Sequence, residues 1–257
     1  MKHSISILCS SILLFAASVS AQPTINDDNL RMAESRGMEI YIRDALAASA
    51  TDLVTVGKLQ SANVSGWITI GDGDNWVVRF LKTCDGGVCS VFDVTFNLEQ
   101  NSANLVELEK PETISDEQLS LWKARQLALA SDFRACSTSY NTVVLPRSND
   151  EDPALIVYLL AATTEPNVIV LGGHHKITIS ADGEKIIESN PLSKSCLNLE
   201  PSRNATALTI THLLTAEPLE THVFSSLLYQ TPIYVGTDAG IFAVEGNQIR
   251  IVQRDRE

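Results

Sequence analysis

Apolar and polar residues alternate most regularly near residue 94. Phe92, Val94 and Phe96 are separated by single polar residues, which is the pattern of a strand with one buried and one solvated face. Similar short runs lie on either side and are separated by turn-forming residues. We therefore expect an antiparallel meander over the segments "VSGWITI", "WVVRFLKT", "VCSVFDVTFN" and "LVELEKP".

Two other stretches show helical spacing. Small and apolar residues recur at steps of three and four before the meander and predict a helix from Asp28 to Ala48. A second helix is predicted to begin after Ser115, because Ser115 and Gln118 fit a capping box. The apolar face of this second helix is expected to carry Leu119, Trp122, Leu129 and Phe133.

Strand patterns return after the second helix. They comprise "YNTVVLP", "ALIVYLLAATT", "VIVLGGHHKITIS", "EKIIES", "TALTITHLL", "THVFSSLLYQ", "PIYVG", "GIFAVE" and "QIRIV". Because consecutive strands follow each helix, we expect an α+β fold made of two helix-then-antiparallel-meander units. These would span residues 22–112 and 113–257, either as separate units or as one continuous domain.

The N-terminus has the features of a signal peptide. Lys2 precedes an apolar stretch from Ile5 to Ala17, and Val19 and Ala21 occupy the small-residue positions of a cleavage site. Residues 1–21 would be removed, so that the mature chain would begin at Gln22 and be periplasmic or secreted. The longest later apolar run, residues 154–162, suits a buried strand and is too short for a membrane span.

The negative net charge of the chain argues against two classes of binding partner. The chain has a formal net charge of −12, and loss of Lys2 with the signal peptide would make it more negative. An acidic surface repels nucleic acid and anionic membranes. We therefore expect neither of them as a partner, and solubility explains the charge without a specific cationic ligand.

Four cysteines remain after residue 21, and an even number in an exported chain suggests two disulfides. The segment "TCDGGVCS" predicts a hairpin turn that brings Cys84 and Cys89 together. Cys136 would then pair with Cys196. On the chain-entropy model the short loop contributes roughly 2 kcal/mol and the long loop roughly 4 kcal/mol. The alternative, a zinc site with four thiolates, usually needs closer paired spacings.

Two adjacent histidines follow a glycine pair in "LGGHHKITIS". In a regular strand His174 and His175 would face opposite ways, so that one would be solvent-facing and the other half-buried. Gly172 and Gly173 suit a bulge or a close backbone approach. The metal-site alternative combines His175 with His212 and His222, and zinc would be its default ion.

Other motifs add little chemistry. The segment "GDGDN" at 71–75 resembles the start of a calcium loop, but its later positions carry Val77, Arg79 and Phe80 instead of ligands, so we expect a hairpin turn. The sequence contains no G-x-S-x-G, H-E-x-x-H, G-x-G-x-x-G or phosphate-binding Gly-Lys-Ser/Thr motif. Neither a cofactor nor a catalytic residue is therefore predicted.

A family resemblance covers mainly residues 124–237. The segments "VYLLAATTEPNVIVLGGHHKITISADG", "PLSKSCL" and "THVFSSLLYQTPIYVGT" resemble a group of uncharacterised exported bacterial proteins. The resemblance implies export and a Cys136–Cys196 link, and it implies no activity. The helix followed by a meander is also similar in outline to cystatin-like inhibitory modules, which is an analogy of fold and does not assign a function.

These observations favour an exported, non-catalytic binding or envelope-associated protein whose partner is an unknown protein or small molecule. The rival hypothesis is a metal-binding protein or metal-dependent hydrolase centred on the GGHH strand. It requires the imidazole of His175 to lie close to that of His212 or His222. A third class, an assembly partner, would be marked by a large apolar surface patch.

Overall fold

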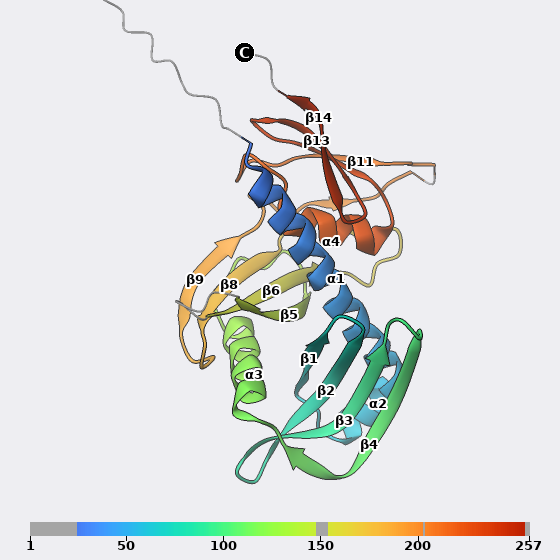
Figure 1. Cartoon of the computed structure of the whole chain (residues 1–257), viewed down its shortest axis with the longest axis vertical. Helices are drawn as coiled ribbons and strands as arrows, with labels where there is room; N and C mark the ends of the chain where they lie inside the picture. Colours follow the sequence, from blue (N-terminus) through green and yellow to red (C-terminus); the bar gives the residue numbers. More distant parts are fainter. Residues whose placement is uncertain (1–24, 148–153, 203, 255–257) are drawn as a thin grey trace, which may run out of the picture.

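A computed structural model describes residues 25–147, 154–202 and 204–254. The expected signal peptide and Gln22 lie outside these residues. The fold is α+β, as predicted, and its three four-stranded sheets lie along one long helix, α1 (Asp27–Val54) (Figure 1). None of the helices in the described ranges combines the length and apolar character needed to cross a bilayer.

Helix α1 is the common support of the three sheets. Asn26 caps its start by accepting a hydrogen bond from the backbone N–H of Asp28 at 2.9 Å. Along the helix, Ala33 packs with the third sheet, Ile40 with the second and Ala50 with the first. The helix extends six residues beyond the predicted end at Ala48, because its last turns are buried against the first sheet.

The first sheet is the predicted meander. It follows the short helix α2 (Val56–Ser61) and has the order β1-β2-β3-β4, every neighbouring pair being antiparallel. The apolar residues of the central strands face α1, as their alternation predicted. The four strands are β1 (Gly66–Asp72), β2 (Asn75–Cys84), β3 (Gly87–Asn97) and β4 (Ser102–Thr113).

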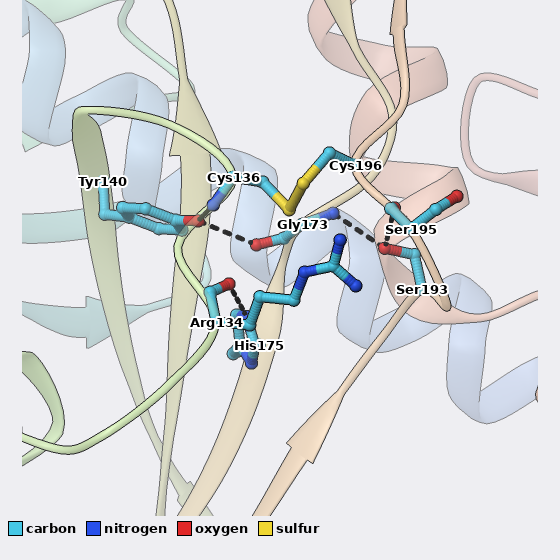
Figure 2. Close-up of a disulfide and its surroundings, with 8 residues drawn as sticks. All are labelled: Arg134, Cys136, Tyr140, Gly173, His175, Ser193, Ser195 and Cys196. Atoms are coloured by element: carbon cyan, nitrogen blue, oxygen red, sulfur yellow. Dashed lines mark hydrogen bonds between the residues drawn. A yellow bond between two sulfur atoms is a disulfide. The ribbon is translucent and has the colours of Figure 1, made fainter.

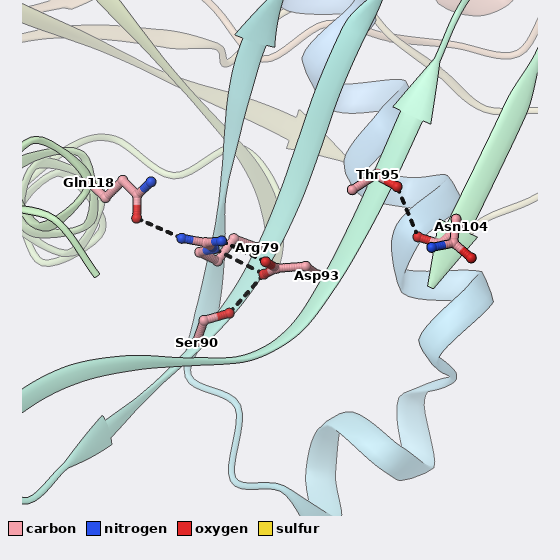
Figure 3. A network of polar contacts seen from close by, with 6 residues as sticks. All are labelled: Arg79, Ser90, Asp93, Thr95, Asn104 and Gln118. Carbon is pink, nitrogen blue, oxygen red and sulfur yellow. Dashed lines mark hydrogen bonds and ion pairs between the residues drawn. The ribbon is translucent and has the colours of Figure 1, made fainter. Parts of the chain in front are cut away.

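The opposite face of this sheet is less solvated than its polar residues suggested. Asp93 is buried, and its carboxylate accepts two hydrogen bonds from Arg79, at 3.0 and 2.6 Å, and one from Ser90 at 2.8 Å. Arg79 also donates to the side chain of Gln118 on helix α3 (Asp116–Leu129) (Figure 3). Pairing with Asp93 raises the pKa of Arg79. This charge-assisted network therefore joins α3 to the sheet.

Helix α3 follows the first sheet, and Ser115 caps it as predicted by accepting from the backbone N–H of Gln118. The second sheet has the order β5-β6-β8-β9 and is antiparallel throughout. Both faces of β6 are buried, one against α3 and the other towards α1, which explains the continuous apolar run at 154–162. The strands are β5 (Ser139–Arg147), β6 (Ala154–Ala162), β8 (His175–Ser180) and β9 (Ile186–Pro191).

The third sheet corrects one prediction. The segment "THVFSSLLYQ" was expected to be a strand, but residues Glu220–Tyr229 form helix α4. Val223 lies one helical turn before Leu227, and both contribute to the apolar core beneath this sheet. Because α4 connects β11 (Leu208–Thr211) to β12 (Ile233–Gly236), these two strands run parallel. The hairpins that follow, through β13 (Gly240–Glu245) and β14 (Gln248–Arg254), are antiparallel as expected.

Both predicted disulfides are present. Cys84 and Cys89 flank the turn between β2 and β3, with their Cα atoms 6.0 Å apart. Cys136 and Cys196 have Cα atoms 5.3 Å apart and lie 60 residues apart in the sequence. The second disulfide lies near a two-stranded ribbon formed by β7 (Ile169–Val170) and β10 (Asn198–Leu199).

Candidate functional site

Two loops at one end of the second sheet enclose a cavity of about 450 Å³. One wall is the loop at 132–136, which follows α3. The other wall is the segment at 189–195, which contains the end of β9 and the turn after it. Gly173 and His175 line the cavity between these walls, and Leu214 lies at its rim. We call this cavity the disulfide pocket.

The Cys136–Cys196 disulfide ties the two walls together (Figure 2). Two hydroxyl groups support it. The Tyr140 hydroxyl accepts from the backbone N–H of Cys136 at 2.7 Å and donates to the carbonyl of Gly173 at 3.2 Å. The Ser193 hydroxyl accepts from the N–H of Gly173 at 2.7 Å and donates to the carbonyl of Ser195 at 2.9 Å. Both walls are thus bonded to the same central glycine.

The glycine pair is required by this packing. A β-carbon on Gly172 would lie 2.8 Å from the backbone nitrogen of Leu197, and one on Gly173 would lie 2.8 Å from Sγ of Cys136. Gly173 also has a φ angle of +84°, which side chains other than glycine rarely adopt. The close backbone approach considered from the sequence is therefore what the structure contains.

His175 stabilises the loop at 132–136, which is the first wall of the pocket. Its Nε2 lies 3.0 Å from the carbonyl oxygen of Arg134, and because a carbonyl can only accept, Nε2 carries the hydrogen. The ring packs against Phe133, with centroids 5.0 Å apart. Burial lowers the pKa of His175. The imidazole is therefore neutral near pH 7, and its Nε2 is already used in holding the loop.

The mouth of the pocket is charged. Arg134 and Lys194 are exposed and lie on opposite walls, and Asp132 is the carboxylate among the lining residues. Figure 2 shows the Arg134 guanidinium extending from its loop toward the wall that carries Ser193. Among the described residues, neither Arg134 nor Lys194 forms an ion pair. Within the part of the chain that the structure describes, no carboxylate thus competes with a ligand for these two cations.

The three histidines considered as metal ligands do not meet. His212 and His222 pack edge to face, with ring centroids 4.8 Å apart. His175 instead contacts Phe133 and Arg134. In the part of the chain that the structure describes, no group of three or more His, Cys, Asp or Glu side chains is arranged to hold a metal ion. The geometry therefore does not favour a metal centre on the GGHH strand.

His174 departs from the prediction that one of the adjacent histidines faces solvent. Both rings are buried, since His174 precedes the first residue of β8 and the alternation of a strand does not yet apply. The His174 ring packs edge to face on Phe224 of α4. Its Nδ1 accepts from the backbone N–H of Ala161 at 3.0 Å, so the hydrogen is on Nε2.

His222 is also a buried histidine whose imidazole is neutral at pH 7. Its Nδ1 accepts from the backbone N–H of Leu219 at 2.9 Å and so caps the start of α4. Burial, with smaller contributions from His212 and His174, lowers the pKa of His222 to about 3, and burial chiefly lowers that of His174 to about 4. These two imidazoles are structural parts of the core at neutral pH.

Arg134 and Lys194 were not among the residues predicted from the sequence to form a site. A signal for them exists, because each half-cystine follows a basic residue by two positions, Arg134 before Cys136 and Lys194 before Cys196. Pairing of those cysteines brings both segments to the same cavity, which Arg134 and Lys194 line. The "SKSC" segment is therefore part of the pocket wall.

No protein-family model and no curated protein matches the sequence. Among solved structures, the Bacillus megaterium YpeB C-terminal domain is 13% identical to this chain, covering 70% of this chain and 71% of that one. The TM-score of 0.18 is too low to relate the two folds. The comparisons therefore leave the function to be argued from the site alone.

Proposed function

We propose that this chain is an exported, non-catalytic binding protein that holds its ligand in the disulfide pocket. The observation that carries the proposal is the cavity of about 450 Å³ between two walls joined by the Cys136–Cys196 disulfide. Ligand pockets commonly have volumes of about 300–1,000 Å³. The side chains in it offer apolar surface, cations and hydroxyl groups, which suit recognition of a ligand.

The walls are held in place without a ligand. The disulfide and the hydroxyls of Tyr140 and Ser193 fix both loops to Gly173. A preformed site loses less conformational entropy on binding than a pair of free loops, and this raises affinity. The cross-link therefore has a role in binding as well as in stability.

Export is supported by the leader pattern at residues 1–21 and by two disulfides, which persist in oxidising compartments. We expect the full chain, expressed in a bacterium, to be recovered from the periplasm or medium with Gln22 as its first residue. Its intact mass should be about 4 mass units below that of the reduced chain. Retention of residues 1–21 in the cytoplasm would contradict the export proposal.

Binding is tested by ligand-observed NMR with a library of small fragments. Ser189 lines the pocket from β9, so Ser189→Trp should fill it and abolish the binding of fragments that the unaltered protein binds. Ser102→Trp is the matched control, because Ser102 is exposed on the edge strand β4, outside the pocket. Equal loss in both variants, or no fragment bound by the unaltered protein, would overturn the proposal.

A further inference from the structure

The proposed binding function can be extended to the class of ligand. We propose that the disulfide pocket takes an anionic amphiphile, a molecule with one carboxylate-like group and a short apolar body. Arg134 and Lys194 would hold the anionic group, and the apolar lining would hold the body. This inference rests on the proposed function and adds the chemistry of the ligand to it.

The placement of the two cations is the first feature that favours an anion. The chain carries 31 acidic and 19 basic residues, and carboxylates already engage several of its cations. Arg79 pairs with Asp93, Lys123 with Glu184 and Lys176 with Glu220. Arg134 and Lys194 pair with no carboxylate of the described residues, and they differ from other unpaired cations such as Lys185 because both line one cavity.

The balance of charge inside the pocket also favours an anion. Two cations and the carboxylate of Asp132 line it, and the buried His175 is neutral because burial lowers its pKa. The local charge is therefore positive on a chain whose net charge is −12. These cations therefore attract an anion to the mouth of the pocket.

The apolar lining of the pocket favours a ligand with an apolar body. Phe133 lies in one wall, and its ring is fixed between Tyr140, 5.1 Å away, and His175, 5.0 Å away, as measured between centroids. Pro191 and Leu214 supply apolar surface on other sides. Because Arg134 and Lys194 are exposed at the mouth, an anionic group can stay hydrated there while the apolar body is buried inside.

The test uses three probes of the same length that differ in charge, namely octanoate, octanamide and octylammonium. Their affinities are measured by calorimetry on the disulfide-bonded protein at pH 7 and low ionic strength. We expect octanoate to bind about tenfold more tightly than octanamide and octylammonium to bind most weakly. Added salt should reduce the advantage of octanoate, because the cations are exposed.

Variants of the two cations test whether these side chains cause the preference for octanoate. Arg134→Gln and Lys194→Gln should each weaken the binding of octanoate about three- to tenfold and leave the affinity for octanamide unchanged. Lys185→Gln is the matched control, since Lys185 is an exposed lysine in the turn before β9, outside the pocket. It should change neither probe, and a loss of octanoate affinity as large as in the two pocket variants would overturn the inference.

The remaining outcomes separate the inference from the proposed function. If octanamide binds as tightly as octanoate and Ser189→Trp abolishes both, the pocket is a binding site but its anion preference is wrong. If octylammonium binds most tightly, Asp132 and not the cations selects the ligand, and the inference is again wrong. If no probe binds and no fragment binds either, both the inference and the proposed function fail.

Discussion

Gly173 and Cys136 lie in direct contact, and a β-carbon on Gly173 would be 2.8 Å from the Cys136 sulfur. The second disulfide and the glycine pair of the GGHH segment are therefore one structural feature. The glycines leave room for the cross-link, and the histidines that follow them are held in the core. This contact leads to the first prediction.

Gly173→Ala should destabilise the protein by about 2–4 kcal/mol, because it combines a clash with a φ angle of +84°. The measurement is urea unfolding together with a count of free thiols. Gly57→Ala is the control, since nothing lies within 4 Å of its added β-carbon and it lies in α2. It should keep or slightly raise the stability. A Gly173→Ala protein with unaltered stability and no free thiol would contradict this account of the packing.

Removal of the two disulfides should have unequal effects. Cys136→Ser with Cys196→Ser opens a loop with a sequence separation of 60, whereas Cys84→Ser with Cys89→Ser opens one of 5. The chain-entropy model predicts losses of about 4 and about 2 kcal/mol, respectively. Only the first pair should also weaken ligand binding, since only that disulfide joins the pocket walls. Equal losses of binding would show that the cross-link does not shape the pocket.

The stability should fall on acidification. His174 and His222 have pKa values lowered to about 4 and about 3 by burial, so below pH 6.5 the unfolded chain takes up protons that the folded protein excludes. Their stabilising effect is complete above pH 6.5 and is lost as the pH falls toward 4 and 3. Asp44 acts in the opposite sense, because burial raises its pKa to about 6 and protonation relieves the buried charge.

When the pH falls from 7.5 to 4.5, the two histidines should lower the free energy of unfolding by about 5 kcal/mol and Asp44 should raise it by about 2 kcal/mol. The net loss of stability is about 3 kcal/mol. Urea unfolding across this range measures it. Asp44→Asn removes the opposing contribution and keeps an acceptor toward Asn141. The variant should therefore lose more stability on acidification than the unaltered protein. A stability that rises from pH 7.5 to pH 4.5 would show that the histidines do not dominate.

Arg125→Lys should destabilise the protein by about 1–2 kcal/mol. The Arg125 guanidinium is buried, lies 4.5 Å from the ring of Trp67 and 5.9 Å from that of Trp122, and donates to Thr142 at 2.8 Å. Lysine keeps the charge but loses the planar group that stacks on the indoles. Lys123→Arg, on the exposed face of the same helix, is the control and should be neutral. A neutral Arg125→Lys would mean that the stacking contributes nothing.

Local patterns determined most of the secondary structure. The meander at β1–β4 followed from alternation and turn residues, and the start of α3 followed from Ser115 and Gln118. The Cys84–Cys89 pair followed from its own turn, and Cys136–Cys196 then followed by elimination. The strands, the helix start and the Cys84–Cys89 pair depend on residues close together in the chain, where steric limits and hydrogen bonding act without the rest of the fold. The Cys136–Cys196 link, with a sequence separation of 60, does not.

Tertiary contacts decided what the local patterns left ambiguous. Glu220–Tyr229 is a helix because its apolar stripe packs beneath the third sheet, and that helix in turn makes β11 and β12 parallel. The pocket arises only when residues 132–136 and 189–195 are brought together, which local periodicity cannot encode. The sequence by itself thus determined most strands, the first and third helices and the pairing of the cysteines. Long-range packing determined the helix at Glu220–Tyr229 and which side chains share a site, because burial depends on neighbours that are distant in the chain.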